Sequence, residues 1–545
     1  MSRLARATRA ALAGCLSALS VAGGLAGCTN AETARPTSRL VIALPQEPES
    51  LNPLLMSGAA TATLVPMIYS LLLTLDERGR LVPDLATSVP TVANGGVSRD
   101  GKTIVYHLRS SATWQDGQPI TSADVVFTYD AIVNPRNNVV SRAGYDEIAS
   151  VDALDRDTVR VRLRRPYAPI LSIFLAPNQN YGLLPAHLLR GKADLNRVSY
   201  NGDPVGSGPY RVASWVRGDH LSLVRNASYY GGAPAIEALE IKFVTDSNTI
   251  LNQLRTGEVN VSLVADPNQL AAYASIPQTR VVRAPLAGVG DLFFNLRDAN
   301  LGDVRVRRAL VEAVDLPTIV RKATKGAQTF ADAGRGLYGW GYDPNAPLPA
   351  YDPRSAARLL DAAGWRRSPG GVRSKDGRSL SLQFAYVLGN AAASSIGLLL
   401  QDQLRAGGVD LQLRGYNPTQ FRAPASSGGP IFGGKYQIGF LEIYTQSDPD
   451  TEWYLGCSQI PPHGFNISAY CDAQTERAEA AGTATYDPAQ RRRFASAVQR
   501  RIAQELPSIP LWQQNAVYVV PSVLRGFRPS LQSATWNVAS WTIGS

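Results

Sequence analysis

Residues 81–132 read LVPDLATSVPTVANGGVSRDGKTIVYHLRSSATWQDGQPITSADVVFTYDAI, and this stretch says most about the fold of the chain. The alternating run at 103–108 follows turn residues, which is typical of a β-strand. Thr121 and Asp124 supply caps for an apolar helix over 125–132. The WQDG turn at 114–117 is predicted to hold a packed tryptophan and to serve the fold rather than a ligand.

The rest of the chain alternates between strand-like and helix-like patterns, which predicts an α/β fold. Short apolar runs predict strands at 40–44, 158–163, 221–225, 238–244 and 409–413. Apolar stretches with caps before them or glycine or proline after them predict helices at 63–75, 247–256, 303–313, 351–363, 395–406 and 488–505. Gly206 and Gly208 flank Ser207 at the entry to a strand, where we expect positive φ angles.

Length and composition exclude two large classes of protein. At 545 residues the chain is too long for one ordinary core, so we expect two or three domains. A hydrophobic fraction of 45% excludes a mostly disordered chain. The mean hydropathy is −0.10 and no uninterrupted apolar run of 18 residues follows residue 27, which excludes a multi-span membrane protein.

The N-terminal segment is typical of an export signal that ends in a lipobox. Three arginines and no acid precede a small, apolar stretch that closes with LAGC at 25–28. A second LAGC, ending at Cys15, would leave almost no apolar stretch before the cut. A short membrane anchor, the alternative, would be interrupted by glycines. We therefore predict a lipoprotein signal peptide over 1–27, lipidation of Cys28 and a tether over 28–38.

The net charge does not indicate a nucleic-acid partner. Removal of the predicted signal peptide would lower the formal charge from +10 to +7, because it removes three arginines and no acid. The remaining excess is spread along the chain, without a block of lysines and arginines interleaved with aromatic residues. We expect no nucleic-acid binding.

Cys457 and Cys471 are the pair that remains once Cys28 is lipidated. An oxidising compartment favours a disulfide between them. Closing a loop of ~15 residues would contribute about 3 kcal/mol in the chain-entropy model. The alternative is a metal site formed with His463, for which the CxxC spacing is missing. We predict the disulfide and no metal site.

Sequence motifs of catalysis are missing from the chain. The four histidines form no H-E-x-x-H arrangement, and neither G-x-S-x-G nor the phosphate-binding G-x-x-x-x-G-K-[ST] occurs. We therefore expect a binding protein without catalytic residues or a cofactor. The alternative from another class is a secreted hydrolase, such as a glycosidase with paired acids.

Six ordered blocks carry a resemblance to a known family. The first is residues 81–132, and the others are VGSGPYRVASW (205–215), DSNTILNQLRTGEVN (246–260), DVRVRRALVEAVD (303–315), YDPRSAARLLDAAGW (351–365) and TATYDPAQRRRFASAVQRRIAQELPSIPLW (483–512). Together they resemble the extracellular solute-binding proteins, family 5, of peptide/nickel-type ABC transporters. These blocks span most of the chain after the predicted signal, and the lipobox fits the same family.

The resemblance implies a large two-lobed periplasmic-binding-protein fold, type II-like, with an inserted domain and a hinge of two crossings. It also implies a monomer that is anchored outside the cytoplasmic membrane or in the periplasm and delivers its ligand to ABC permease subunits served by separate ATPase subunits. A receptor that presents ligand to another partner is an alternative. The implied segments are lobe I over 39–85, 203–283 and 515–545, an insertion over 86–202, and lobe II over 284–514, with crossings near 284–295 and 511–520.

The stretch GFLEIYTQSDP at 439–449 departs from the pattern of peptide binders in this family. In those relatives a Trp and an Asp precede an acidic–Pro pair, and the Asp holds the amino terminus of the peptide. Alignment on Asp448 puts Thr445 in place of that Asp and Glu442 in place of the Trp. Glu442 or Asp448 would have to replace the anchor, or Glu442 is simply a solvated or paired acid.

We therefore expect oligopeptides as the ligand, with modified peptides, oligosaccharides, opine-like conjugates or metal chelates as alternatives. An acid for the ammonium group and roomy, wet pockets are the features that a peptide requires. The family fold also implies that the loop after the first strand, with Glu47, Glu49 and Asn52, faces the cleft. It further implies aromatic faces for the ligand at Tyr416, Trp453 and Tyr454. The predicted ligand-binding residues are Glu49, Asn52, Tyr416, Glu442, Tyr444, Thr445, Gln446, Asp448 and Trp453.

Overall fold

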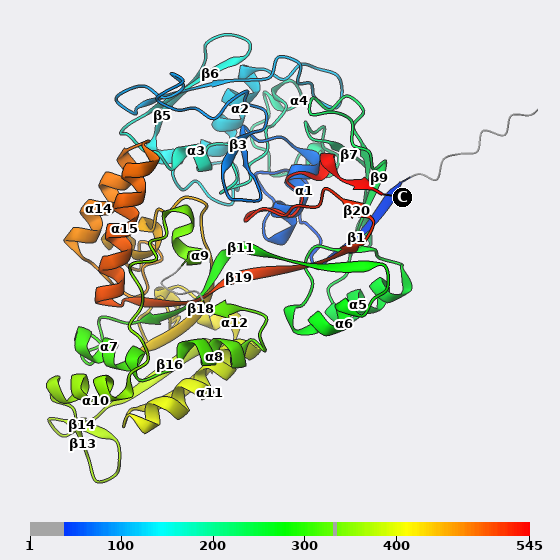
Figure 1. Ribbon diagram of the computed structural model, residues 1–545. Coiled ribbons are helices and arrows are strands. Elements are labelled where there is room, and N and C mark those ends of the chain that lie inside the picture. Colours follow the sequence, from blue (N-terminus) through cyan, green and yellow to red (C-terminus); the bar gives the residue numbers. More distant parts are fainter. Residues whose placement is uncertain (1–37, 331–334, 545) are drawn as a thin grey trace, which may run out of the picture. The chain divides into compact units, whose positions relative to one another are not determined.

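The structure is a computed structural model that describes residues 38–330 and 335–544 (Figure 1). The described chain forms a compact unit that begins at Ser38. The predicted signal peptide, Cys28 and the tether before residue 38 lie outside the described residues. None of the described helices combines the length and the apolar character that a membrane span requires.

One mixed sheet organises the described chain, and eleven strands of that chain contribute to it. Neighbouring strands are often distant in sequence, which requires crossover connections. The order is β17 (Asp410–Tyr416), β16 (Ser381–Val387), β18 (Ile438–Tyr444), β11 (Thr279–Phe294), β19 (Ser508–Pro521), β10 (Val261–Ser262), β1 (Arg39–Leu44), β9 (Ala238–Phe243), β8 (His220–Arg225) and β7 (Tyr210–Val216). The short strand β12 (Thr329–Phe330) pairs with β19 outside this order.

Strands β11 and β19 are long, antiparallel and central in the sheet (Figure 1). Ala284 lies opposite Ala516 in one half of the pair, and Leu292 lies opposite Ile509 in the other half. The sheet continues from β19 through β10 into β1, and from β11 through β18 into β16. We call the part built on β1 and β7–β10 lobe I, and the part built on β16–β18 lobe II. The fold is therefore two-lobed, and the chain crosses between the lobes within β11 and within β19.

Two helices cover part of lobe I. Helix α5 (Ser247–Thr256) begins at Asp246, whose carboxylate caps the first turn, and ends at Gly257, where φ is 78°. Its apolar face packs with the short helix α6 (Leu270–Ala274) and with Val519 of β19 in one cluster. The bounds of α5 match the predicted helix, because cap and stop residues are both local signals.

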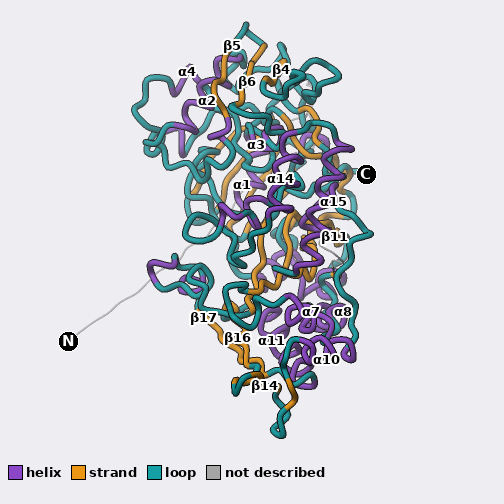
Figure 2. Tube along the Cα trace, turned by 90° about the vertical axis from the view of Figure 1, so that its left-hand side faces the viewer, coloured by secondary structure: helices purple, strands orange, loops and turns teal. Residues whose placement is uncertain are grey.

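Lobe II has its own core, in which four helices pack with the aromatic side chains of Phe384, Phe440 and Trp512. Figure 2 shows these helices grouped beside β16 and β17. Each helix begins after an Asp or Asn whose side chain accepts a backbone N–H of the first turn. They are α7 (Val304–Glu312), α8 (Leu316–Ala323), α10 (Pro353–Ala362) and α11 (Ala391–Ala406).

Residues 86–202, which we call the inserted subdomain, carry a separate three-stranded sheet in the order β4-β6-β5. Helix α2 packs beside it and begins with a capping box between Thr121 and Asp124, which confirms the predicted capping residues, although the helix starts at Ser122 rather than at residue 125. The buried residues of this subdomain and of lobe I form one continuous cluster. The elements are β4 (Thr103–His107), α2 (Ser122–Val133), β5 (Ile148–Ala153), β6 (Thr158–Leu163), α3 (Ile170–Ile173) and α4 (Ala186–Leu189).

The helix predicted over 63–75 is wrong beyond residue 68. Helix α1 (Ala59–Ile68) ends there because the Ile68 carbonyl accepts the N–H groups of Ser207 and Gly208. The expected positive φ at Gly206 and Gly208 is also absent. These glycines are needed because a Cβ at Gly206 would lie 2.0 Å from the Ile68 oxygen. The chain after α1 instead forms a small hairpin of β2 (Leu73–Leu75) and β3 (Leu81–Pro83).

The WQDG turn at 114–117 joins the inserted subdomain to the segment around Gly206. Trp114 is buried, and the Gln115 side chain accepts the Gly206 N–H at 2.9 Å and donates to the Tyr210 carbonyl at 2.8 Å. Gly117 has a φ of +88°, which the turn requires. The turn therefore has the structural role that the sequence predicts.

The long helix α15 (Pro488–Glu505) matches its prediction and packs against α14 (Ala473–Ala484). Cys457 and Cys471 form a disulfide with a Cα–Cα distance of 4.7 Å. The remaining short elements are α9 (Arg335–Tyr338), β13 (Arg366–Arg367), β14 (Arg373–Lys375), β15 (Arg378–Ser379), α12 (Pro418–Phe421), α13 (Glu452–Leu455), β20 (Leu524–Arg525) and β21 (Thr542–Ile543).

Asp291 is a fully buried acid in the lobe II half of β11. The Tyr454 hydroxyl donates to its Oδ2, while Oδ1 has no partner within the described chain. Burial raises the pKa of Asp291 to about 7, although hydrogen bonds from Tyr454, Ser508 and nearby backbone groups oppose the shift. The folded protein therefore holds this proton at pH values where the unfolded chain releases it.

We predict that Asp291→Asn flattens the pH dependence of stability. In the wild type, the stability supplied by the protonated carboxyl is complete below about pH 4 and is lost as the pH rises to 7, at roughly 1.4 kcal/mol per unit. Urea unfolding of both proteins at pH 5 and pH 8 measures the difference. The variant should lose a few kcal/mol less over this interval, and equal losses would contradict the assignment.

Candidate ligand-binding site

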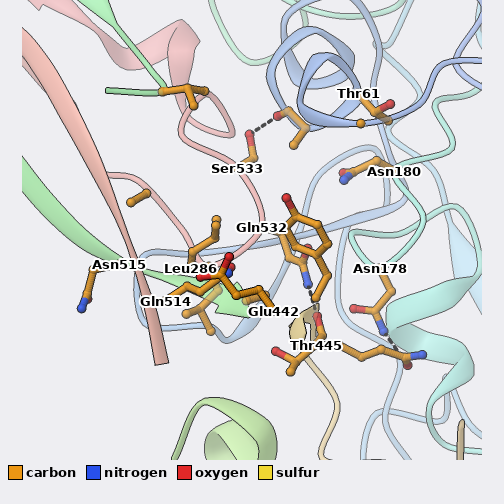
Figure 3. Close-up of a pocket in the computed structure, with 18 of the residues that line it drawn as sticks. Thr61, Asn178, Asn180, Leu286, Glu442, Thr445, Gln514, Asn515, Gln532 and Ser533 are labelled. Atoms are coloured by element: carbon orange, nitrogen blue, oxygen red, sulfur yellow. Dashed lines mark hydrogen bonds between the residues drawn. The ribbon is translucent and has the colours of Figure 1, made fainter. Parts of the chain in front are cut away.

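A cavity of about 1460 Å³ lies between the two lobes and the inserted subdomain (Figure 3). Pockets for drug-sized ligands usually measure about 300–1,000 Å³, so this cavity has room for a larger ligand. Its lining combines apolar surface with many carboxamide groups. The carboxamide residues are Asn178, Gln179, Asn180, Asn268, Gln328, Asn390, Gln446, Gln459, Gln514, Asn515 and Gln532.

Glu442 lies on β18 and lines the cavity beside Gln514 of β19 (Figure 3). Burial raises the pKa of Glu442, and hydrogen bonds with Gln514 and Asn390 oppose that rise, as does the more distant Arg422. Its main partners are therefore uncharged amides rather than a basic side chain. Glu442 is consequently a cavity acid and not the solvated or salt-bridged acid of the alternative interpretation.

The segment after β18 connects lobe II to the inserted subdomain. Thr445 is buried and lines the cavity, and its carbonyl accepts a hydrogen bond from Gln532 at 3.4 Å. The Asn178 amide donates to Gln446 at 3.3 Å, and the Asn178 oxygen accepts the Ser447 N–H at 3.0 Å. These bonds hold Thr445 and Gln446 at the cavity wall, and Figure 3 shows Thr445 beside Gln532.

Two of the predicted aromatic residues also line the cavity. Tyr444 is 79% exposed, which is unusual for a large side chain at the end of a central strand. Trp453 is half-buried and packs against Tyr454 and Phe465 at ring distances of 5.4 and 5.9 Å. Both rings therefore offer an apolar face to a ligand without further rearrangement of the core.

The structure does not place Asp448 at the cavity. Its two carboxylate oxygens accept hydrogen bonds from Arg491 of α15 at 2.7 and 2.5 Å, and both side chains are buried. Such a bidentate pair fixes the loop that follows β18 onto α15. We therefore leave Asp448 out of the site.

Five other predicted residues also lie away from the cavity lining. Asn52 is fully buried and donates to Asn201 at 3.0 Å, and Glu49 is exposed in the same loop. Tyr416 accepts a hydrogen bond from Gln383 and packs on Phe421. Glu47 accepts from the Trp215 indole, and the Tyr454 hydroxyl is bound in the core. Family position alone did not separate cavity-facing residues from their neighbours.

Most of the carboxamide residues, and the two acids Asp450 and Glu452, were not predicted from the sequence. A signal was present in β19, where Gln513, Gln514 and Asn515 interrupt an otherwise apolar strand. The residues from the inserted subdomain carried no such signal, because only the tertiary fold brings them to lobe II. Their contribution could not be read from local pattern.

Charged side chains are distributed unevenly along the cavity. Lys322 and Lys325 line it near β12. Where the inserted subdomain meets lobe II, four acids and one base line it, and we call this region the acidic end. Its residues are Asp146, Glu147, Arg165, Asp450 and Glu452. In residues 38–330 and 335–544, no group of three or more His, Cys, Asp or Glu side chains is arranged to hold a metal ion.

A two-lobed α/β fold with a large cavity between the lobes, lined by apolar surface and carboxamides, is the arrangement expected of a solute-binding protein. The sequence matches the bacterial extracellular solute-binding proteins, family 5, over residues 80–460. The chain therefore belongs to this family, whose members bind solutes for transport.

Similar proteins extend the match to nearly the whole chain. Protein XP55 of Streptomyces lividans is 29% identical over 515 residues, which is 92% of this chain and 88% of XP55. The oligopeptide-binding protein AppA of Bacillus subtilis is 24% identical, over 92% of this chain and 91% of AppA. The crystal structure of NikZ from Campylobacter jejuni in complex with Ni(L-His) is similar with a TM-score of 0.75 and 26% identity, over 93% of this chain and 100% of NikZ.

We predict that Arg491→Met lowers the free energy of unfolding by about 3–5 kcal/mol, because it leaves the Asp448 carboxylate buried without a partner. The double variant Asp448→Asn/Arg491→Met should lose less, since no buried charge remains. Chemical unfolding measures both. If Asp448→Asn instead left stability unchanged and abolished ligand binding, Asp448 would belong to the binding site.

Proposed function

We propose that this protein is the substrate-binding subunit of an ABC importer, which captures oligopeptides in the interlobe cavity and delivers them to a membrane permease. The single observation that carries the peptide assignment is the carboxamide lining, which comes from both lobes and from the inserted subdomain. A peptide backbone presents alternating N–H and C=O groups, and carboxamides both donate to and accept from such groups. The name of the relative AppA, an oligopeptide-binding protein, supports the same assignment.

The volume of the cavity supports a ligand of several residues. Variable side chains need roomy pockets in which water fills the remaining space, and about 1460 Å³ meets that need better than a close-fitting site does. The exposed ring of Tyr444 and the half-buried ring of Trp453 supply apolar faces for such side chains. This combination is less suited to a single small ion.

A non-peptide solute is the second candidate for the same importer role. Thr445 stands where the peptide binders of the resemblance carry an acid, which removes their anchor for the amino terminus. The similar protein NikZ was crystallised in complex with Ni(L-His), which is a metal chelate. Modified peptides, oligosaccharides and opine-like conjugates belong to the same candidate class.

Capture would proceed by closure of the lobes around β11 and β19, the two strands in which the chain crosses between them. The proposed boundaries place lobe II over 284–514 and lobe I on either side of it. Lipidation of Cys28 would hold the protein at the outer face of the cytoplasmic membrane or in the periplasm. There a monomer could pass its ligand to permease subunits, whose ATPase subunits supply the energy.

Native mass spectrometry of the full-length protein, extracted with detergent from its own host, tests the function. We expect a series of bound masses that fragment into amino-acid residues. Gln514→Leu should lower the bound fraction, because it removes a cavity carboxamide. The matched control Gln412→Leu changes an exposed residue of β17 and should not. The protein mass itself reports cleavage before Cys28 and the added acyl chains.

A single non-peptide mass in every preparation would overturn the peptide assignment and favour the second candidate. A protein that is purified without a ligand and also fails to bind a synthetic peptide pool would overturn the peptide assignment as well. A retained N-terminal segment without acyl chains would overturn the lipid anchor alone.

A further inference from the structure

Lobe II meets the inserted subdomain at a place that lies apart from the crossing strands β11 and β19. Figure 1 shows α14 and α15 extending from lobe II, with the turn between them beside α3 of the inserted subdomain. This turn comprises residues 485–487, since α14 ends at Ala484 and α15 begins at Pro488. Its partners in the inserted subdomain include residues 166–168, which precede α3.

Two hydrogen bonds join the two parts at this place. The Ala168 N–H donates to the Thr483 carbonyl at 2.7 Å. That carbonyl belongs to the last turn of α14, where the helix itself offers no donor, so the inserted subdomain caps a helix of lobe II. The Tyr486 hydroxyl donates to the Tyr167 carbonyl at 3.1 Å. Both bonds have to break when the lobes separate.

The ring of Tyr486 adds an apolar contact to these bonds. It is half-buried and packs against the cluster of buried residues that lobe I and the inserted subdomain share. A Cβ at Gly101 would lie 3.1 Å from a ring carbon of Tyr486 and 3.1 Å from Pro166, so glycine leaves room for the ring. Lobe II thus places one aromatic side chain against the core of the opposite part, and this burial favours the form in which the two parts touch.

The contact lies outside the cavity. Among the described residues that line the cavity, Tyr167 takes part in the contact, and it does so through its backbone carbonyl. Tyr486 and Thr483 are not among them. Their interactions can therefore change the affinity for a ligand only through the equilibrium between the open and the closed form. An interaction that exists in the closed form alone shifts this equilibrium toward closure and tightens binding.

We propose that Tyr486 is the centre of an interlobe latch, a contact that stabilises the closed form and so sets the affinity of the cavity without touching the ligand. The latch consists of Thr483 and Tyr486 of lobe II with Gly101 and residues 166–168 of the inserted subdomain. This proposal rests on the proposed function, because it needs lobes that close on a solute. Tyr486 is accordingly a positioning residue, and its loss should weaken the binding of different ligands by one common factor.

The experiment measures the binding of random hexapeptide pools to full-length protein by native mass spectrometry over a series of pool concentrations. Tyr486→Phe removes the hydroxyl bond and should raise the midpoint concentration about two- to tenfold, the range of one net hydrogen bond. Tyr486→Ala also removes the ring and should raise the midpoint further. The control Tyr351→Ala changes a tyrosine of lobe II that is 53% exposed and outside the cavity lining, and it should leave the midpoint unchanged.

Two further readouts separate a latch from a permanent structural contact. We expect the ligand-free protein to be open, with Tyr486 in water, so Tyr486→Ala should shift the urea midpoint of the ligand-free protein little. The same variant should weaken the binding of a pool rich in acidic residues and of a pool rich in basic residues by the same factor, because the latch touches neither.

Each outcome decides the proposal. An unchanged binding midpoint for Tyr486→Ala overturns the latch. A ligand-free variant that is destabilised as strongly as its binding is weakened also overturns it, since the contact would then be permanent. Different factors for the two pools would place Tyr486 in contact with the ligand and overturn it too. These three results leave the proposed function standing, because the wild type binds peptides. A wild type that binds neither pool overturns the proposed function together with the latch.

Discussion

The antiparallel pairing of β11 with β19 is the constraint on which the rest of the structure depends. Strand β11 pairs with β18 of lobe II and β19 pairs with β10 of lobe I, so their mutual pairing joins the two lobes in one sheet. A register shift between Pro285 and Val289 interrupts the ladder near its middle. The strands are therefore tightly bound within each lobe and less regular between the lobes, which is where a hinge has to bend.

The same pairing places the polar groups of the cavity. Gln514 and Asn515 follow Trp512, which is buried in the lobe II core, and precede Val517, which is buried in lobe I. The two carboxamide residues of β19 that line the cavity thus lie between the two cores. Glu442 faces the cavity from β18, so lobe II adds an acid beside these amides. Closure of the lobes would bring lobe I and the inserted subdomain onto groups that are already oriented.

Much of the fold could be predicted from local signals. Asp246 and Gly257 bound α5, and Asp487 caps α15, because capping is decided within a few residues. The end of α1 could not be predicted, since it depends on the approach of residues 206–208 from far along the chain. For the same reason the sequence predicted a positive φ at Gly206, whereas the structure requires glycine there because the Ile68 carbonyl packs against it.

The candidate site was predicted only in part, and the physical reason differs between its residues. The family pattern points to the segment around β18, and this is why part of the lining could be predicted. The correctly predicted residues are Glu442, Tyr444, Thr445, Gln446 and Trp453. Asp448 lies in the same segment, yet its partner Arg491 is 43 residues away on another element, and that ion pair turns it inward. Asp450 also lines the cavity and was missed, because its position there comes from the tertiary fold rather than from a motif.

Ligand capture is proposed to close the two lobes around β11 and β19. Small-angle X-ray scattering tests it most directly, on the same full-length preparation before and after removal of the ligand that it carries. We expect a larger radius of gyration for the ligand-free protein and a return to the smaller value when the ligand is added back. Identical scattering curves for the two forms would contradict closure, and with it the role of the interlobe cavity in capture.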